Sequence, residues 1–216
     1  MKQNSFFYAL LLGLISLGLS SCSEADDYQR VIISTDFGEM EAILYNSTPQ
    51  HRDNFIKLVE EGFYDSLLFH RVMEGFMIQG GDPDSRDARA GVVLGVGGPG
   101  YQIPAEIGAP HFRGVLAAAR NNNPEKASNG SQFYIVQGSP VAGALLDQME
   151  RARGFVYNEA QRNLYQEIGG APQLDSDYTV FGEIVVGLAV IDQIAAVPVD
   201  QYKRPIQNVR MFIRKK

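Results

Sequence analysis

The residues best suited to chemistry lie in one apolar stretch, residues 69–82, which carries an arginine and a glutamine among large hydrophobic side chains. Read as two short strands, residues 68–73 and 76–79, the stretch places Phe69 and Arg71 on the same face. A guanidinium on an apolar surface needs hydrogen-bond partners, and it offers five donors in fixed directions while staying charged. Arg71 therefore either ties down backbone carbonyls inside the fold or binds a polar group of a ligand, and the spacing leaves both interpretations open.

The sequence contains no second group of side chains spaced for nucleophilic, metal or cofactor chemistry. Its three histidines are scattered, it has a single cysteine, and no G-x-S-x-G nucleophile motif occurs. Residues 95–100 match G-x-G-x-x-G, but Pro99 interrupts the helix that would have to begin there to bind a dinucleotide. We therefore expect no metal and no cofactor. We also expect His51, on the first predicted helix, to face solvent.

The start of the chain reads as a targeting segment. Lys2 precedes an apolar run that is shorter than the roughly 20 residues of a membrane span. Residues 19–22, Leu-Ser-Ser-Cys, resemble a bacterial lipobox, which implies lipidation of Cys22; an ordinary signal peptide with an incidental cysteine is the alternative. Residues 1–21 are then a lipoprotein signal peptide and residues 22–29 a flexible tether. We expect a protein anchored by lipid to a bacterial membrane in the cell envelope, on the periplasmic side or the outer surface.

The charge of the chain limits its partners. It has 25 acidic and 19 basic residues, a net charge of −6, and no cluster of basic residues. We therefore expect no binding to nucleic acid. Residues 30–216 suffice for one domain with its own core, and we expect that domain to be a monomer.

Short apolar runs separated by turn residues predict a domain made mainly of β-strands. Residues 30–35 and 39–45 read as a hairpin, and Thr48-Pro49 begins a helix, with Thr48 as its N-cap, that Gly62 ends. Further strands are predicted at residues 114–120, 132–137, 178–186 (as a strand pair) and 206–213, and a further helix at 188–197. Few helices among many short strands favour an antiparallel sheet or barrel over an alternating α/β fold.

The strand predicted at residues 132–137 has two different faces. Gln132 and Tyr134 lie on one face, and Phe133 and Ile135 on the other. This pattern suits a strand that lines a groove, and it suits an ordinary half-exposed strand equally well.

Residues 138–172 differ in character from the rest of the chain. Apolar residues recur there at near-helical spacing, Gly154 interrupts the pattern, and Pro172 ends it. We predict one or two amphipathic helices in this segment.

Five segments, in this order along the chain, resemble the cyclophilin family of peptidyl-prolyl isomerases. They are residues 69–82, 97–106, 114–120, 129–133 and 180–183. The resemblance spans about residues 30–213 and leaves residues 139–171 as a helical insertion. It implies a mainly β fold, a closed eight-stranded antiparallel barrel capped by two helices, and residues 48–61 and 188–197 suit those helices.

By this resemblance Arg71 is the catalytic residue. The substrate-binding positions fall on Phe76, Met77, Gln79, Ala119, Arg120, Gln132, Tyr134, Leu174 and Tyr178. Four positions depart from the pattern of many family members: Arg120 replaces an asparagine, Tyr134 a phenylalanine, Gln173 a tryptophan and Tyr178 a histidine. Because that tryptophan helps the family bind cyclosporin, we expect weak cyclosporin inhibition here.

The resemblance implies isomerisation of X-Pro bonds in unfolded or partly folded exported proteins. Rotation about such a bond crosses a barrier of ~18–20 kcal/mol because amide resonance is lost, yet it breaks no covalent bond. It therefore requires an apolar pocket for the proline ring and a donor, such as Arg71, for the imide nitrogen, which accepts well only when twisted. The alternatives are a cyclophilin-fold peptide-binding or chaperone module with incidental activity, and a purely structural surface lipoprotein.

Overall fold

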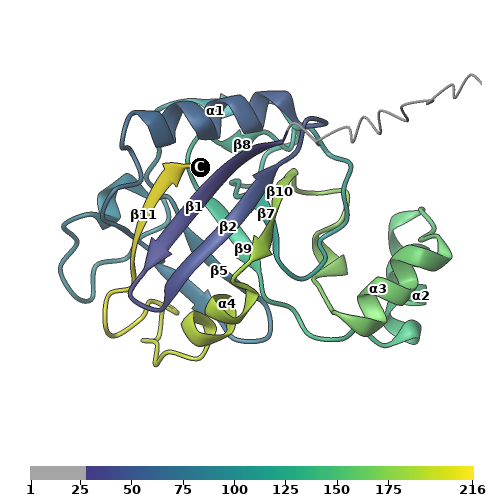
Figure 1. Ribbon diagram of the computed structural model, residues 1–216. Helices are drawn as coiled ribbons and strands as arrows, with labels where there is room; N and C mark the ends of the chain where they lie inside the picture. The colour runs from purple at the N-terminus through teal and green to yellow at the C-terminus, as the bar shows by residue number, and fades with distance from the viewer. Residues whose placement is uncertain (1–27) are drawn as a thin grey trace, which may run out of the picture.

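The computed structural model describes residues 28–216, so the predicted signal peptide, the lipidation of Cys22 and most of the predicted tether lie outside the described residues. Within them, nine strands form one curled antiparallel sheet in the order β3-β11-β1-β2-β10-β7-β9-β5-β4 (Figure 1). These strands are β1 (Gln29–Thr35), β2 (Gly38–Leu44), β3 (Leu67–Leu68), β4 (Arg71–Met73), β5 (Met77–Gly80), β7 (Val115–Ala118), β9 (Phe133–Val136), β10 (Val180–Val186) and β11 (Arg210–Lys215). β6 (Gln102–Ile103) and β8 (Ser128–Asn129) form a separate pair.

The predicted N-terminal hairpin is confirmed, because β1 and β2 pair over their whole length. Alternate residues of these strands point into the core, where Val31, Ile33, Met40 and Leu44 are fully buried. Each buried side chain of this size contributes about 1.5–3 kcal/mol to folding. The period-2 pattern visible in the sequence therefore fixes which face of the sheet turns inward.

The expected closed eight-stranded barrel is confirmed only as a curled antiparallel sheet. The order has two ends, β3 and β4, which are separated in the chain by Phe69 and His70 alone. Among the described residues no ladder joins β3 to β4, because the backbone N–H of Phe69 bonds to Val209 O at 2.9 Å and that of Val72 to Lys203 O at 2.8 Å. One continuous stretch of chain, rather than a ninth ladder of hydrogen bonds, thus brings the two edges together.

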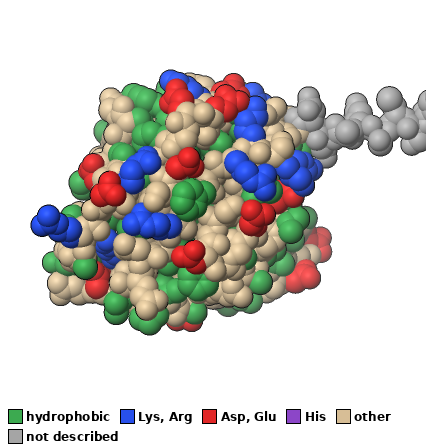
Figure 2. Space-filling model, turned by 60° about the vertical axis from the view of Figure 1, so that its left-hand side comes forward, with side chains coloured by type: hydrophobic (Ala, Val, Ile, Leu, Met, Phe, Trp, Pro, Cys, Tyr) green, Lys and Arg blue, Asp and Glu red, His purple; other side chains and the backbone are tan. Residues whose placement is uncertain are grey.

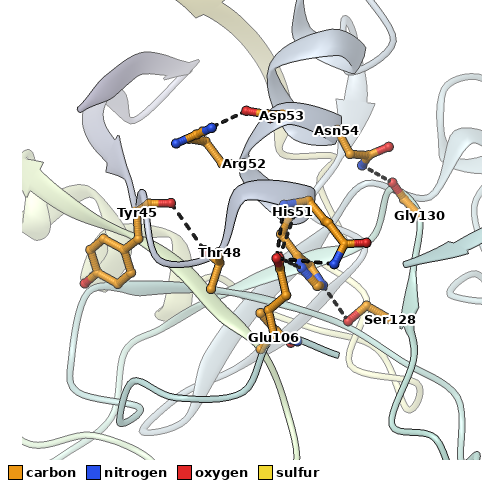
Figure 3. A network of polar contacts seen from close by, with 11 residues as sticks. Tyr45, Thr48, His51, Arg52, Asp53, Asn54, Glu106, Ser128 and Gly130 are labelled. Carbon is orange, nitrogen blue, oxygen red and sulfur yellow. Dashed lines mark hydrogen bonds and ion pairs between the residues drawn. The ribbon is translucent and has the colours of Figure 1, made fainter. Parts of the chain in front are cut away.

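Two helices cover the sheet as predicted. α1 (Pro49–Glu60) packs against β10 and β11, and α4 (Leu188–Ala195) against β2, β4 and β5, at opposite ends of the sheet (Figure 1). Pro49 opens α1 and Gly62 follows its end with a positive φ of 65°, as expected. Thr48 is the N-cap residue of α1, as predicted, but within the described structure its side chain makes no capping hydrogen bond, and Glu106 accepts the N–H groups of Gln50 and His51 instead (Figure 3).

The insertion contains two helices, interrupted at Gly154 as the sequence predicts. They are α2 (Gly143–Arg153) and α3 (Glu159–Glu167), followed by the 3₁₀ helix η2 (Pro172–Leu174); a second 3₁₀ helix, η1 (Pro83–Ser85), follows β5. Gly154 ends α2 in the left-handed region, and Asn158 begins α3 in a capping box with Gln161. The two helices stand beside the sheet rather than on it (Figure 1). Within residues 28–216, the sheet, α1 and α4 build the main core, to which α2 and α3 contribute no residue.

Two predicted strands differ in the structure. Residues 178–186 contain one strand, β10, rather than a strand pair, and Gly182 lets it approach β2, since a Cβ there would lie 2.4 Å from Ile43 O. The last strand is β11 rather than residues 206–213. The chain before it folds back on itself instead, with the Ile206 N–H bonded to Pro198 O at 2.9 Å.

The surface carries mixed charge. On the face drawn in Figure 2, basic and acidic side chains are interspersed rather than gathered by sign. None of the helices formed by residues 28–216 is long and apolar enough to cross a membrane.

Candidate active site

A groove of about 360 Å³ collects nine of the ten predicted site residues. Its lining comprises His70, Arg71, Phe76, Met77, Gln79, Leu94, Gly95, Ala119, Arg120, Tyr134, Leu174 and Tyr178. Gln132 is the exception among the predicted residues. It is buried and accepts a hydrogen bond from Gln79, which lines the groove.

Strand register explains why residues far apart in sequence meet here. In the ladders β4–β5–β9, Arg71 lies opposite Gln79, and Gln79 lies opposite Tyr134. β7 continues the row, since Ala117 pairs with Tyr134. Cross-strand partners point to the same face of a sheet. The groove-lining interpretation of residues 132–137 is therefore correct for Tyr134.

Arg71 is half-buried at one side of the groove and is oriented by side chains. One guanidinium nitrogen donates to Gln79 Oε1 at 3.1 Å, and the other lies 3.0 Å from Met73 Sδ. The Gln79 amide donates in turn to Gln132 Oε1 at 3.1 Å, and the Gln132 amide to Gly97 O at 2.7 Å. Burial lowers the pKa of Arg71 from its ordinary value.

These contacts decide between the two interpretations that the sequence left open for Arg71. Its hydrogen bonds within the described residues go to a glutamine and a methionine side chain, not to backbone carbonyls. The guanidinium thus keeps donors that face the groove. This arrangement favours a binding role over a purely structural one.

Apolar and aromatic side chains form the rest of the groove. Met77 and Tyr134 are buried, and Phe76, Leu174 and Tyr178 pack against them. The rings of Tyr134 and Tyr178 meet edge to face, with centroids 5.9 Å apart. The groove thus offers a pocket lined by apolar side chains next to one charged donor.

Arg120 lies at the rim of this pocket. Its guanidinium carbon lies 4.8 Å from the ring centroid of Tyr178, and its Nε donates to Asp177 O at 2.8 Å. Arg120 and Tyr178, two of the positions at which the sequence is expected to depart from the family pattern, are therefore in contact.

The hydroxyl of Tyr134 has a partner, which the sequence could not name. It lies 3.0 Å from His111 Nε2, and His111 is fully buried. Burial raises the pKa of Tyr134 well above its ordinary value, so the hydroxyl keeps its proton. Tyrosine can replace phenylalanine in this pocket because its polar end is satisfied.

The expectation that His51 faces solvent is wrong. Its imidazole is 2% exposed, with Nδ1 2.7 Å from Glu106 Oε2 and Nε2 2.9 Å from Ser128 Oγ (Figure 3). The order Ser-His-Glu resembles a hydrolase triad, but Ser128 is 1% exposed, so a substrate cannot reach it. The three side chains instead join the start of α1 to β8 and the loop at Glu106, which is a structural role.

Three lining residues were missed from the sequence: His70, Leu94 and Gly95. Leu94 and Gly95 belong to the glycine-rich loop at residues 94–100. This loop is held against the groove because the buried carboxylate of Asp82 accepts the N–H groups of Gly95 at 2.5 Å and Gly97 at 3.4 Å. The glycine-rich run was the available signal, since such a run lets backbone approach another element closely.

Comparisons with known proteins agree with this geometry. Residues 30–214 match the family described as cyclophilin type peptidyl-prolyl cis-trans isomerase/CLD. The chain is 34% identical to a peptidyl-prolyl cis-trans isomerase of Staphylococcus aureus (strain USA300) over 181 residues, which cover 83% of this chain and 87% of that protein. It is 35% identical to a bifunctional phosphatase/peptidyl-prolyl cis-trans isomerase of Streptococcus pyogenes over 222 residues, which cover 96% of this chain and 44% of that protein.

Solved structures show the same fold. The crystal structure of a Cryptosporidium parvum cyclophilin type peptidyl-prolyl cis-trans isomerase has a TM-score of 0.63 and 25% identity, covering 88% of this chain and 98% of that one. A second structure of that protein, in the presence of the dipeptide Ala-Pro, has a TM-score of 0.62. The match over nearly all described residues, in sequence and in structure, shows that this chain belongs to the cyclophilin family and is a peptidyl-prolyl cis-trans isomerase.

Proposed function

We propose that this isomerase acts on proline-containing segments of unfolded or partly folded exported proteins, with Arg71 as its catalytic residue. The observation that carries the proposal is a charged donor, Arg71, held by Gln79 at the side of an apolar pocket. The Cryptosporidium relative solved in the presence of Ala-Pro supports a proline-containing ligand.

The chemistry follows from where the donors lie. The pocket formed by Phe76, Met77, Tyr134 and Leu174 seats the proline ring, and Arg71 donates to the imide nitrogen. That nitrogen becomes a good acceptor only when twisting removes its amide resonance, so the bond strengthens in the transition state. A thousandfold acceleration needs only about 4 kcal/mol, which a charge-assisted bond in a half-buried site can largely supply.

Replacing the guanidinium tests this assignment. Arg71→Ala should lower kcat/KM for a prolyl peptide by roughly tenfold or more, about 1.4 kcal/mol of transition-state stabilisation. A protease-free isomerisation assay measures the rate, and circular dichroism confirms folding. Arg30→Ala is the matched control. It removes an arginine of β1 that pairs with Glu41 of β2 and does not line the groove, so turnover should stay unchanged. A folded Arg71→Ala variant with full turnover would show that another group carries the reaction.

We also propose that the protein is anchored by lipid to a bacterial membrane in the cell envelope, because lipobox-like residues precede Cys22. Lipidation of an N-terminal cysteine with more than one acyl chain would give stable membrane anchoring. Cys22→Ser should therefore move the protein from the membrane fraction to the soluble fraction, without changing kcat/KM. If the variant stays with the membrane, the anchor lies elsewhere.

A peptide-binding or chaperone module remains the second candidate because the insertion exposes apolar side chains. Val156 is 83% exposed, and Leu145, Leu164 and Ile168 are also exposed. An aggregation assay with a denatured client protein separates the two functions. Suppression of aggregation that survives Arg71→Ala, when turnover does not, would assign binding to this surface.

A further inference from the structure

A buried polar network joins the insertion to the groove. Its members are Tyr134, His111, Asp175, Tyr157 and Tyr165, and none is more than 5% exposed. Tyr134 lines the groove, whereas Tyr157 and Tyr165 belong to the insertion. Because buried polar groups are costly unless they are paired, such a network strongly favours one arrangement of its members.

The carboxylate of Asp175 lies at the centre and accepts four hydrogen bonds. Its Oδ1 accepts from the backbone N–H of His111 at 2.8 Å and from His111 Nδ1 at 2.7 Å. Its Oδ2 accepts the hydroxyls of Tyr157 and Tyr165, each at 2.6 Å. Burial, followed by the neighbouring carboxylate, raises the pKa of both tyrosines, so they remain donors. The insertion thus supplies half of the donors that this buried carboxylate requires.

The network also fixes the direction of the hydroxyl of Tyr134. The imidazole of His111 lies between Asp175 and Tyr134: its Nδ1 is 2.7 Å from Asp175 Oδ1, and its Nε2 is 3.0 Å from the Tyr134 hydroxyl oxygen. The rings of His111 and Tyr134 are nearly parallel, with an interplanar angle of 12°. Tyr134 is therefore held at its hydroxyl end while its ring faces the pocket.

Asp175 lies in the chain segment that forms one wall of the groove, although its buried carboxylate does not line it. Asp175 directly follows Leu174 and precedes Tyr178, both of which line the groove. The last turn of α2 holds this segment from outside, because Arg153 donates to Gln173 O at 2.5 Å and to Asp175 O at 3.1 Å. Arg153 of α2 and the two tyrosines, Tyr157 before α3 and Tyr165 within it, thus both hold the segment of residues 173–178.

We propose that Tyr157, Tyr165, Asp175 and His111 are positioning residues of the isomerase. They hold Tyr134 and the wall at residues 174–178 in the shape that receives the proline ring before the substrate binds. Such preorganisation lowers the ordering cost of binding and keeps the ring aligned with the donor. The inference rests on this groove being the substrate site, as proposed above.

The double variant Tyr157→Phe/Tyr165→Phe tests the proposal, since it removes two donors and keeps both rings. We expect kcat/KM to fall roughly three- to tenfold, mainly through a higher KM, at a temperature where the variant is folded. Tyr64→Phe is the matched control. It removes another buried tyrosine hydroxyl, which donates to Ser131 O at 3.2 Å in the main core, and it should lower the melting temperature without changing kcat or KM.

Wild-type kcat and KM in the folded double variant would overturn the proposal. If the double variant does not fold, Tyr157→Phe alone allows the same comparison, because Tyr165 still donates to Asp175. The Arg71→Ala variant separates this test from that of the groove itself. Full turnover of the Arg71→Ala variant would show that this groove is not the substrate site. If Arg71→Ala loses turnover but the tyrosine variants keep wild-type kcat and KM, only the positioning role is wrong.

A double-mutant cycle tests the path through His111. Asp175→Asn should lower kcat/KM in the wild-type background and much less in a Tyr134→Phe background, because residues acting as one unit are not additive. Strict additivity of the two changes would show that Asp175 does not act on Tyr134, and would overturn that path.

Discussion

At the residue scale, Gln173 is the position at which the sequence predicts a difference in ligand preference. Gln173 is exposed and directly precedes Leu174, which lines the groove. The backbone oxygen of Gln173 accepts a bond from Arg153, so its place beside the groove is held while its side chain is free. A glutamine there provides polarity but little apolar area, in contrast to a tryptophan.

Gln173→Trp should therefore raise cyclosporin affinity more than it raises kcat/KM. The added contact area is worth roughly 1–3 kcal/mol, about ten- to a hundredfold in affinity. Small prolyl peptides depend on the inner pocket and Arg71, so their turnover should change little. Titration of both proteins with cyclosporin measures the effect. Tight inhibition of the wild type, or no gain from the tryptophan, would place Gln173 outside the cyclosporin contact.

At the scale of elements, the insertion is part of the site's support rather than an independent addition. A surface loop normally costs little to insert or remove, because loop-closure entropy changes slowly with length. Here, however, removal of residues 139–171 would leave Asp175 buried without its two tyrosine donors. The main core, built by the sheet with α1 and α4, contains no residue of the insertion among those described.

Deletion of residues 139–171 with a short Gly-Ser bridge should leave the domain folded but less stable, by about 3 kcal/mol or more for two lost bonds to a buried charge. Turnover should fall as well. Chemical denaturation gives the free energy of unfolding, and Asp175→Asn in the deletion variant should restore part of it by removing the uncompensated charge. Unchanged stability of the deletion variant would contradict this account, and complete loss of folding would show that the helices belong to the core.

At the scale of the whole molecule, buried histidines make folding sensitive to acid. Burial lowers the pKa of His70 to about 4, and neither of its ring nitrogens has a hydrogen-bond partner among residues 28–216. Burial also lowers the pKa of His51, although Glu106 opposes the change. Both imidazoles bind a proton more weakly in the folded protein, so their contribution to stability is complete above about pH 6.5 and is lost as the pH falls.

Stability should therefore decrease from about pH 6.5 toward pH 4, and His70 alone can account for about 3 kcal/mol of the loss. His70→Leu removes the titrating group and its two unpaired nitrogens. It should be neutral or stabilising near pH 7 and should flatten the pH dependence. Urea midpoints across this pH range measure both effects. An equally steep profile in the variant would assign the acid sensitivity to other groups.

The sequence by itself determined the local elements and the residue types of the site. Alternation in residues 30–45 gave the hairpin, Pro49 and Gly62 bounded α1, and Gly154 divided the insertion, because each depends on backbone preferences of near neighbours. The resemblance to the family named nine residues that the structure then brings together in one groove. Arg71 itself was found as a charge in an apolar stretch, which is a property of sequence alone.

Only the tertiary structure decided which polar groups meet. The side chain of Glu106, rather than that of the N-cap residue Thr48, accepts the first N–H groups of α1, and Asp175 joins His111 to two tyrosines of the insertion. These partners lie 10 to 64 residues apart along the chain, and hydrogen bonds at such separations leave no periodic signal in a sequence. They depend on the curl of the sheet and on the exact approach of loops to one another, since a hydrogen bond is lost within a few tenths of an ångström.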